Sequence, residues 1–174
     1  MLKKMLPKMY IESFNKLNLD FLIAKGIKLI ICDIDNTLVS HDEPYPNDDV
    51  KKFIEAVFSK GLNIVLISNN NKNRVSLFAK ELELDYFYSA KKPLSYTYKK
   101  IRDRYNISFN NVAAVGDQLL TDILGANRLN IYSVLTEPLF SKDLIYTRAN
   151  RVLENIVYKY FESKKLLVKG EFYE

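Results

Sequence analysis

Short runs of consecutive apolar residues alternate along the chain with segments whose apolar positions repeat at helical spacing. The runs predict strands at residues 27–32, 62–67, 86–88, 112–115 and 131–135. The segments between them predict helices at residues 47–60, 71–82, from Pro93 toward Tyr105, and at 121–129. Asn47 is a suitable N-cap and Gly61 a suitable end for the first of these helices. Strands that alternate with helices in this way indicate βαβ units around a parallel sheet.

The predicted fold class is therefore α/β, a three-layer Rossmann-like parallel sheet. The length of 174 residues fits one domain, since domains usually hold roughly 100–200 residues. We expect a single domain over residues 1–174, with a basic, helical N-terminal extension at 1–26, a catalytic core at 27–136 and an amphipathic C-terminal helix at 140–165. No repeat or linker indicates a second domain.

Composition narrows the chemistry that this chain can perform. The single cysteine, Cys32, excludes an intrachain disulfide, and with the single histidine, His41, it argues against a Cys/His zinc site or a Ser-His triad. The net charge of +5 permits an anionic partner such as nucleic acid, phospholipid or a phosphate ester. No signal peptide and no apolar run of membrane-spanning length is recognisable, so we expect a cytoplasmic protein.

Two acidic residues directly follow the first predicted strand, in the segment DIDNTL at residues 33–38. Carboxylates this close repel each other unless a cation joins them, and hard oxygen ligands favour Mg²⁺. Asp33 could act as a nucleophile toward phosphorus, and Asp35 as a general acid and then a general base. The alternative is a loop rich in Asp and Asn that only makes turns.

Polar side chains also follow the next two predicted strands. The segment SNNN at residues 68–71 offers the Ser68 hydroxyl, Asn69 and backbone N–H groups as a phosphate cradle, or else simply caps the next helix. Lys92 precedes Pro93 at an expected helix start, where a cation is unfavourable for the helix dipole. Lys92 could bind phosphate and offset the charge of Asp33, or be a solvated surface residue.

The strand at residues 112–115 is followed by GDQLLTD at residues 116–122. Asp117 can reach the same crevice as Asp33, because sites in parallel sheets form at the carboxyl ends of the strands. Asp122 could bind the metal or orient Lys92, or only act as an acidic first-turn residue. The polar groups at 33, 68, 92 and 117 are each separated by one strand–helix unit, so together they predict one site.

These residues resemble the haloacid dehalogenase-like phosphatase superfamily. Its four motifs match DIDNTL, Ser68, Lys92 and GDQLLTD in order, over roughly residues 27–135. The stretches SNNN, AKKP and GDQLLTDILGANR are similar to its YqeG-type branch, which includes phosphatidylglycerophosphate phosphatases of bacteria and mitochondria. MLKKMLP at the N-terminus and TRANR at residues 147–151 extend the resemblance over most of the chain.

The resemblance implies a mechanism, position by position. Asp33 would attack phosphorus and become an aspartyl-phosphate, while Asp35 would protonate the leaving alcohol and then activate water. Ser68, with nearby groups such as Asn69, would hold the phosphoryl oxygens, and Lys92 would neutralise developing charge. The implied ligands of Mg²⁺ are the Asp33 carboxylate, the Asp35 backbone carbonyl and Asp117, with Asp122 nearby.

Phosphatases of this superfamily often carry a cap domain, and the segments between the motifs are too short here to hold one. The expected open site suits a large substrate, or a homo-oligomer in which a neighbouring subunit acts as a lid. Lysines among apolar residues in residues 1–10 and in the C-terminal helix lead to the hypothesis of peripheral contact with an anionic membrane. The alternative is that both segments pack on the sheet and that their charges are solvated.

We therefore expect a Mg²⁺-dependent phosphomonoester hydrolase, most concretely one that dephosphorylates the anionic lipid phosphatidylglycerophosphate in phospholipid synthesis. The alternatives are a phosphatase of a phosphoprotein, a nucleic-acid end or a small phosphate ester, and a non-catalytic phosphate-binding or assembly module. No nucleic-acid-binding motif is recognisable, so nucleic acid is not an expected partner.

Overall fold

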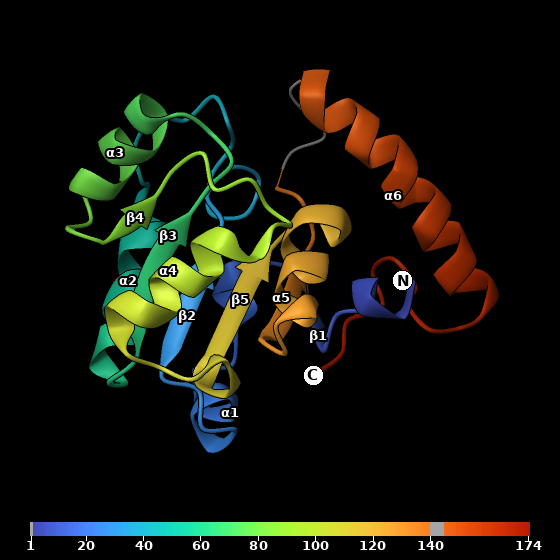
Figure 1. The fold of residues 1–174 in the computed structure, drawn as a ribbon, viewed down its shortest axis with the longest axis horizontal. Coiled ribbons are helices and arrows are strands. Elements are labelled where there is room, and N and C mark those ends of the chain that lie inside the picture. The colour runs from blue at the N-terminus through green and yellow to red at the C-terminus, as the bar shows by residue number, and fades with distance from the viewer. Residues whose placement is uncertain (1, 140–144) are drawn as a thin grey trace.

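The computed structural model describes residues 2–139 and 145–174, and the side chains of all of these except 145–150. A six-stranded sheet in the order β1-β6-β5-β2-β3-β4 forms its centre (Figure 1). Each neighbouring pair of strands is parallel. The strands are β1 (Met9–Ile11), β2 (Leu29–Cys32), β3 (Asn63–Ile67), β4 (Tyr86–Phe87), β5 (Val112–Gly116) and β6 (Tyr132–Thr136). This architecture confirms the predicted Rossmann-like α/β class.

Helices cover both faces of the sheet. Apolar residues of α1 (Leu19–Ala24), α2 (Asp48–Ser59) and α3 (Lys72–Lys80) share one core with alternate residues of the strands. The other strand residues pack against α4 (Ser95–Tyr105) and α5 (Leu124–Arg128). Because both faces are covered, the central strands consist of consecutive apolar residues, which explains why the hydrophobic pattern locates them. Short helical turns complete the chain: η1 (Leu2–Met5), η2 (Phe14–Lys16), η3 (Phe109–Asn111) and η4 (Leu119–Ile123).

Two of the four predicted helix starts, at Asn47 and Asn71, are right, because these residues are the N-caps of α2 and α3; the other two are displaced. The Asn47 side chain accepts a hydrogen bond from the Val50 N–H and caps α2, as predicted, and Gly61 takes a left-handed φ of 73° just past the end of the helix. The helix expected to open at Pro93 begins instead at Ser95, two residues later. The helix expected at residues 121–129 begins earlier, as the π-helical turn η4, and continues as α5.

The N-terminal residues are part of the sheet. Strand β1 pairs with β6, and the backbone of Tyr10 exchanges hydrogen bonds with that of Tyr173 near the C-terminus. Met5, Met9 and Tyr10 are buried. These apolar side chains therefore pack inside the protein, which was the alternative to lipid contact. Strand β1 was not predicted because three residues are too few for a hydrophobic pattern to show.

Helix α6 (Ile145–Ser163) lies to one side of the sheet (Figure 1). Its inner face packs in a separate apolar cluster through Val157, Tyr158 and Phe161. Residues 140–144, which open the predicted C-terminal helical region, lie outside the described residues, as do the predicted apolar and basic side chains of residues 145–150. No helix among the described residues has the length and apolar character needed to span a membrane.

The described chain has no cap domain. A loop alone joins β2 to α2, and the segment from β3 to β4 contains only α3 and its flanking turns. The sheet edge that carries the candidate residues is therefore left without a second domain above it, as the motif spacing predicts.

Candidate active site

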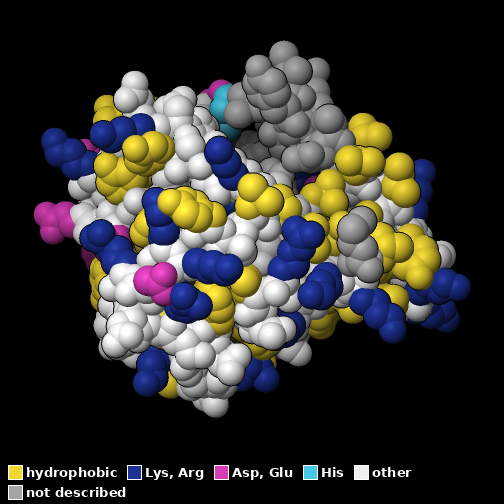
Figure 2. Space-filling view, in the orientation of Figure 1, with side chains coloured by type: hydrophobic (Ala, Val, Ile, Leu, Met, Phe, Trp, Pro, Cys, Tyr) yellow, Lys and Arg dark blue, Asp and Glu magenta, His cyan; other side chains and the backbone are white. Residues whose placement is uncertain are grey.

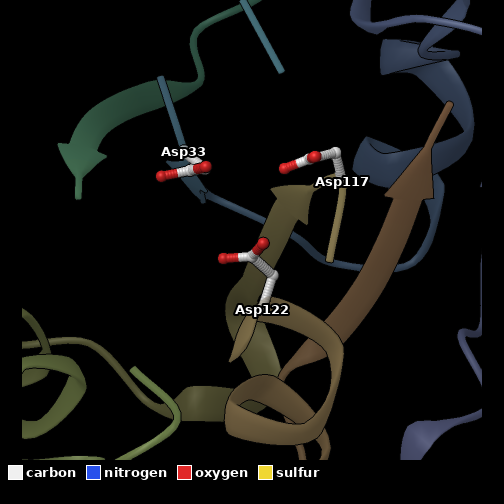
Figure 3. Close-up of side chains that lie close together, drawn as sticks. All are labelled: Asp33, Asp117 and Asp122. Atoms are coloured by element: carbon white, nitrogen blue, oxygen red, sulfur yellow. The ribbon is translucent and has the colours of Figure 1, made fainter. Parts of the chain in front are cut away.

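Three buried carboxylates meet at the carboxyl edge of the sheet. Asp33 follows β2, and Asp117 follows the neighbouring strand β5. Asp122 comes from η4, and Figure 3 shows the three side chains directed toward one another. One carboxylate oxygen from each lies within 4.8 Å of the others, the one such acidic group found among the described residues. The structure thus brings together three of the predicted site residues.

Lys92 lies in the same cluster. Its Nζ donates to Asp33 Oδ1 at 2.7 Å and to Asp122 Oδ1 at 2.6 Å, and its side chain is only 3% exposed. The interpretation of Lys92 as a solvated surface residue is therefore excluded. Asn69 holds the backbone of this lysine: its Oδ1 accepts from the Lys92 N–H at 2.7 Å, and its Nδ2 donates to the Lys92 carbonyl at 3.3 Å.

Gly116 makes room for Asp122. A Cβ atom built on Gly116 would lie 2.3 Å from the Asp122 carboxyl carbon, far inside van der Waals contact. Asp122 Oδ2 also accepts a hydrogen bond from the backbone N–H of Gln118 at 3.1 Å. Asp122 stands in the first turn of η4 and also contacts Lys92, so it is not only an acidic first-turn residue.

Ser68 is buried at the end of β3, and its Oγ accepts a hydrogen bond from the Asn70 N–H at 3.0 Å. The cap of α3 is Asn71, whose side chain accepts from the Arg74 N–H. Within the SNNN segment, it is therefore the last residue, Asn71, that caps the helix. Ser68 and Asn69 occupy the turn between β3 and this cap, at the sheet edge that carries Asp33.

The Asp35 carboxylate is held apart from the three-aspartate cluster. Its Oδ1 accepts from Arg74 Nε and Nη2 at 3.2 and 3.0 Å, and its Oδ2 accepts from Asn70 Nδ2 at 3.2 Å. Arg74 comes from the first turn of α3, and sequence reasoning did not identify it. Its position three residues after the N-cap Asn71 would have been a weak signal for a partner of the acidic loop.

A second arginine that sequence reasoning missed reaches the site from α6. Arg151 forms an ion pair with the Asp117 carboxylate and donates to the Asp117 carbonyl at 3.2 Å. It also donates to Glu154 at 3.0 Å, and the other oxygen of this buried glutamate accepts from the Leu120 N–H at 3.0 Å. The sequence signal that could have identified Arg151 is its pairing with Glu154, one turn later in a helix whose neighbouring positions are apolar.

Burial and crowding shift the pKa values of the clustered groups. Burial raises the pKa of Asp33 well above its usual value; Lys92 opposes this rise, and the nearby carboxylates add to it. Burial likewise raises the pKa of Asp117 to about 7, against the opposing charge of Arg151. Burial lowers the pKa of Lys92, but Asp122 and Asp33 more than compensate and raise it above its usual value. An additional cation would therefore stabilise the ionised carboxylates.

The donor set fits a divalent metal. Three carboxylates within reach of one another supply the hard oxygen ligands that such ions prefer. The burial of all three keeps water from screening their repulsion, so a cation between them would be held strongly.

Comparisons with known proteins agree with this geometry. Residues 15–130 match the family described as haloacid dehalogenase-like hydrolase. The chain is 34% identical over 155 residues to a Bacillus subtilis (strain 168) protein named "Probable phosphatase YqeG", which covers 88% of this chain and 90% of the relative.

Solved structures share the fold. A crystal structure of a protein from Listeria monocytogenes serotype 4b aligns with a TM-score of 0.53 and 15% identity, covering 76% of this chain and 99% of that one. The cobalt-bound deoxy-D-mannose-octulosonate 8-phosphate phosphatase from Haemophilus influenzae aligns with a TM-score of 0.51 and 13% identity, covering 78% and 89%. The family match and the 34% identical relative show that the chain belongs to the haloacid dehalogenase-like hydrolase family, and that it is a phosphatase.

Proposed function

We propose that this phosphatase hydrolyses phosphate monoesters with Mg²⁺ and through a phosphoryl group carried by Asp33. The observation that supports the proposal most is the buried contact of Asp33 with Lys92 beside two further carboxylates. A nucleophilic carboxylate needs a neighbouring cation if it is to approach an anionic phosphate ester, and Lys92 is fixed where it can supply that charge.

Asp33 and Asp117 would hold the metal, with Asp122 close by and the Asp35 backbone carbonyl as the further ligand that the motif implies. When bound, Mg²⁺ would offset the negative charge shared by the nucleophile and the ester. Arg151 forms an ion pair with the Asp117 carboxylate, so a bound metal ion would compete with this arginine for the same side chain. This ligand set is supported by the short distances, within 4.8 Å, between carboxylate oxygens of Asp33, Asp117 and Asp122.

The reaction would proceed in two steps. An Asp33 oxygen bonds to phosphorus as the bond from phosphorus to the ester oxygen breaks, and Asp35 gives its proton to the leaving alcohol. A water molecule then attacks phosphorus, Asp35 takes a proton from it, and the bond to Asp33 breaks to release inorganic phosphate. Ser68 and Asn69 would bind the phosphoryl oxygens, and Lys92 would balance their charge.

Asp35 needs to change partners during this cycle. Arg74 donates two hydrogen bonds to one oxygen of its carboxylate, and Asn70 donates one to the other oxygen. In the second step Asp35 accepts a proton from water. For the first step, the Arg74 contact has to open so that a protonated Asp35 can face the leaving oxygen.

The substrate that we propose is phosphatidylglycerophosphate, dephosphorylated during phospholipid synthesis at the cytoplasmic face of the membrane. An open site without a cap accommodates a headgroup that projects from a surface, and the basic character of the chain suits an anionic lipid. A small soluble ester would leave the same site exposed to water. A second copy of the chain could cover the site instead, and this homo-oligomer is the competing explanation.

Substrate comparison tests the proposal. Purified enzyme with Mg²⁺ should release phosphate from phosphatidylglycerophosphate in mixed micelles much faster than from glycerol 3-phosphate or a phosphopeptide. Equal or reversed preference would reject the lipid but leave the phosphatase chemistry intact. Phosphate release from none of the three substrates, or release that persists at full rate in Asp33→Asn, would reject the chemistry itself.

A further inference from the structure

Helix α6 has an exposed apolar face beside the one that packs on the protein. Val152, Ile156 and Tyr160 follow one another at intervals of four residues and are 62%, 61% and 42% exposed, and Leu153 beside them is 54% exposed. Residues four apart lie on one side of a helix, so Val152, Ile156 and Tyr160 form a continuous stripe, here named the outer face. Leu153 lies between this stripe and the packed side of the helix, because the buried residues Val157 and Phe161 follow it at the same spacing. A helix that only packs on a core has one apolar side, so the outer face requires another explanation.

Positive charge borders this outer face. Lys159 lies beside the stripe, and Lys164 and Lys165 follow at the end of the helix; all three are exposed. The exposed Lys3 and Lys4 belong to η1, whose Met5 packs in the same cluster as the inner face of α6. Figure 2 shows hydrophobic side chains together with Lys and Arg side chains on this flank of the molecule.

The acidic residues of the helix are directed elsewhere. Glu154 is buried and bonded to Arg151, so it contributes no free negative charge to the surface. Glu162 shares the four-residue spacing of Glu154 and the buried Tyr158, and so lies away from the outer face. The exposed stripe is therefore apolar in the middle and basic at its border.

We infer that the outer face of α6 docks on the surface of an anionic phospholipid bilayer. Apolar side chains would enter the boundary between headgroups and acyl chains, while the bordering lysines contact anionic headgroups. Charge decides between this occupant and a second copy of the chain. Two outer faces packed together would bring their lysines close to one another, whereas the lipid headgroups carry the complementary charge.

Docking in this orientation would bring the catalytic edge of the sheet close to the lipid. Val152 and Leu153 directly follow Arg151, which contacts Asp117 in the carboxylate cluster. The surface that binds lipid and the residue that reaches the site thus belong to one helical turn. This consequence rests on the proposed function, whereas docking itself does not depend on catalysis.

Vesicle binding tests the inference with the full chain. Sedimentation with vesicles of phosphatidylcholine alone, and of equal parts of phosphatidylcholine and phosphatidylglycerol, gives the two affinities. Wild type should bind the anionic vesicles and bind the neutral ones much more weakly. The triple variant V152Q/I156Q/Y160Q keeps good helix formers on α6 and should lower affinity for the anionic vesicles by roughly tenfold or more.

The matched control replaces exposed apolar residues on α1, α2 and α3. The variant I23Q/F58Q/L77Q removes three apolar side chains that are 39%, 48% and 40% exposed and should bind vesicles as wild type does. Both triple variants should hydrolyse a soluble artificial phosphate ester at the wild-type rate, which shows that they are folded and separates docking from catalysis.

Three outcomes would overturn the inference. The first is wild type that binds neither kind of vesicle, and the second is equal loss of binding in both triple variants. The third is a concentration-dependent dimer, seen by analytical ultracentrifugation without lipid binding, that only the α6 variant abolishes. This last result would assign the outer face to a second copy of the chain.

Discussion

Replacing Gly116 by alanine should disable the site without touching any charged group. The new Cβ would lie 2.3 Å from the Asp122 carboxyl carbon and 2.6 Å from its Cβ and Oδ2. To reach ordinary van der Waals contact at 3.4 Å, the carboxyl carbon must retreat by about 1 Å. Asp122 accepts from Lys92 Nζ at 2.6 Å, and a retreat of that size breaks the hydrogen bond.

The expected magnitudes follow from the burial of both groups. Overpacking of this kind costs about 1–3 kcal/mol of the free energy of unfolding. Loss of the Asp122 contact also leaves Lys92 less well fixed against Asp33, and a misplacement of about 1 Å in a catalytic group can lower the rate by roughly 100-fold. We therefore expect Gly116→Ala to reduce kcat far more than its modest loss of stability would explain.

The assay is a double-mutant cycle on phosphate release and on urea unfolding. Asp122→Gly removes all three atoms that the new Cβ meets, so adding Gly116→Ala to it should change the rate and the stability little further. Gly61→Ala serves as the control, because no atom lies within 4 Å of its added Cβ and only the left-handed φ of 73° is strained. Near-wild-type activity in Gly116→Ala, or equal damage with and without Asp122, would refute the steric reasoning.

Three further predictions concern groups around the cluster. Asn69→Ala removes both side-chain contacts to the Lys92 backbone and should lower kcat by about tenfold or more with a small loss of stability; an unchanged kcat would contradict this positioning role. Arg151→Gln should raise the affinity for Mg²⁺ measured by calorimetry, because it removes the competing partner of Asp117; unchanged or weaker binding would contradict the competition.

The third of these predictions concerns pH. The pKa of Asp117 is about 7 when folded and 3.8 in its ordinary state, so the metal-free folded state holds the extra proton between these values. Its free energy of unfolding should therefore fall as the pH rises from about 4 to about 7, and Asp117→Asn should flatten that slope in urea titrations. A slope that Asp117→Asn leaves unchanged would contradict the assignment.

The central sheet could be predicted from the sequence because of its burial. Strands such as β2 and β5 are covered on both faces and need uninterrupted apolar residues, which the printed sequence shows directly. Strand β1 has only three residues, and the backbone hydrogen bonds between Tyr10 and Tyr173 join chain ends that no local pattern connects. Its place in the sheet follows from long-range packing.

The candidate site also contains residues that the sequence predicts and residues that it does not. Asp33 and Asp117 are predictable because each directly follows a buried strand, and parallel strands bring such positions to one edge. Arg74 and Arg151 come from helices, and the direction in which a helix presents a side chain depends on how it packs. The sequence placed Arg151 on an amphipathic helix, but its contact with Asp117 requires the tertiary arrangement of α6.

Trapping of the phosphorylated enzyme tests the central claim most directly. Wild type is mixed with Mg²⁺ and a phosphate ester, quenched with acid, and analysed by mass spectrometry of the intact chain and its peptides. The account predicts one added phosphoryl group, located on Asp33, that is absent without metal and absent in Asp33→Asn. Hydrolysis with no such adduct under rapid quenching, or an adduct on a different residue, would contradict the account.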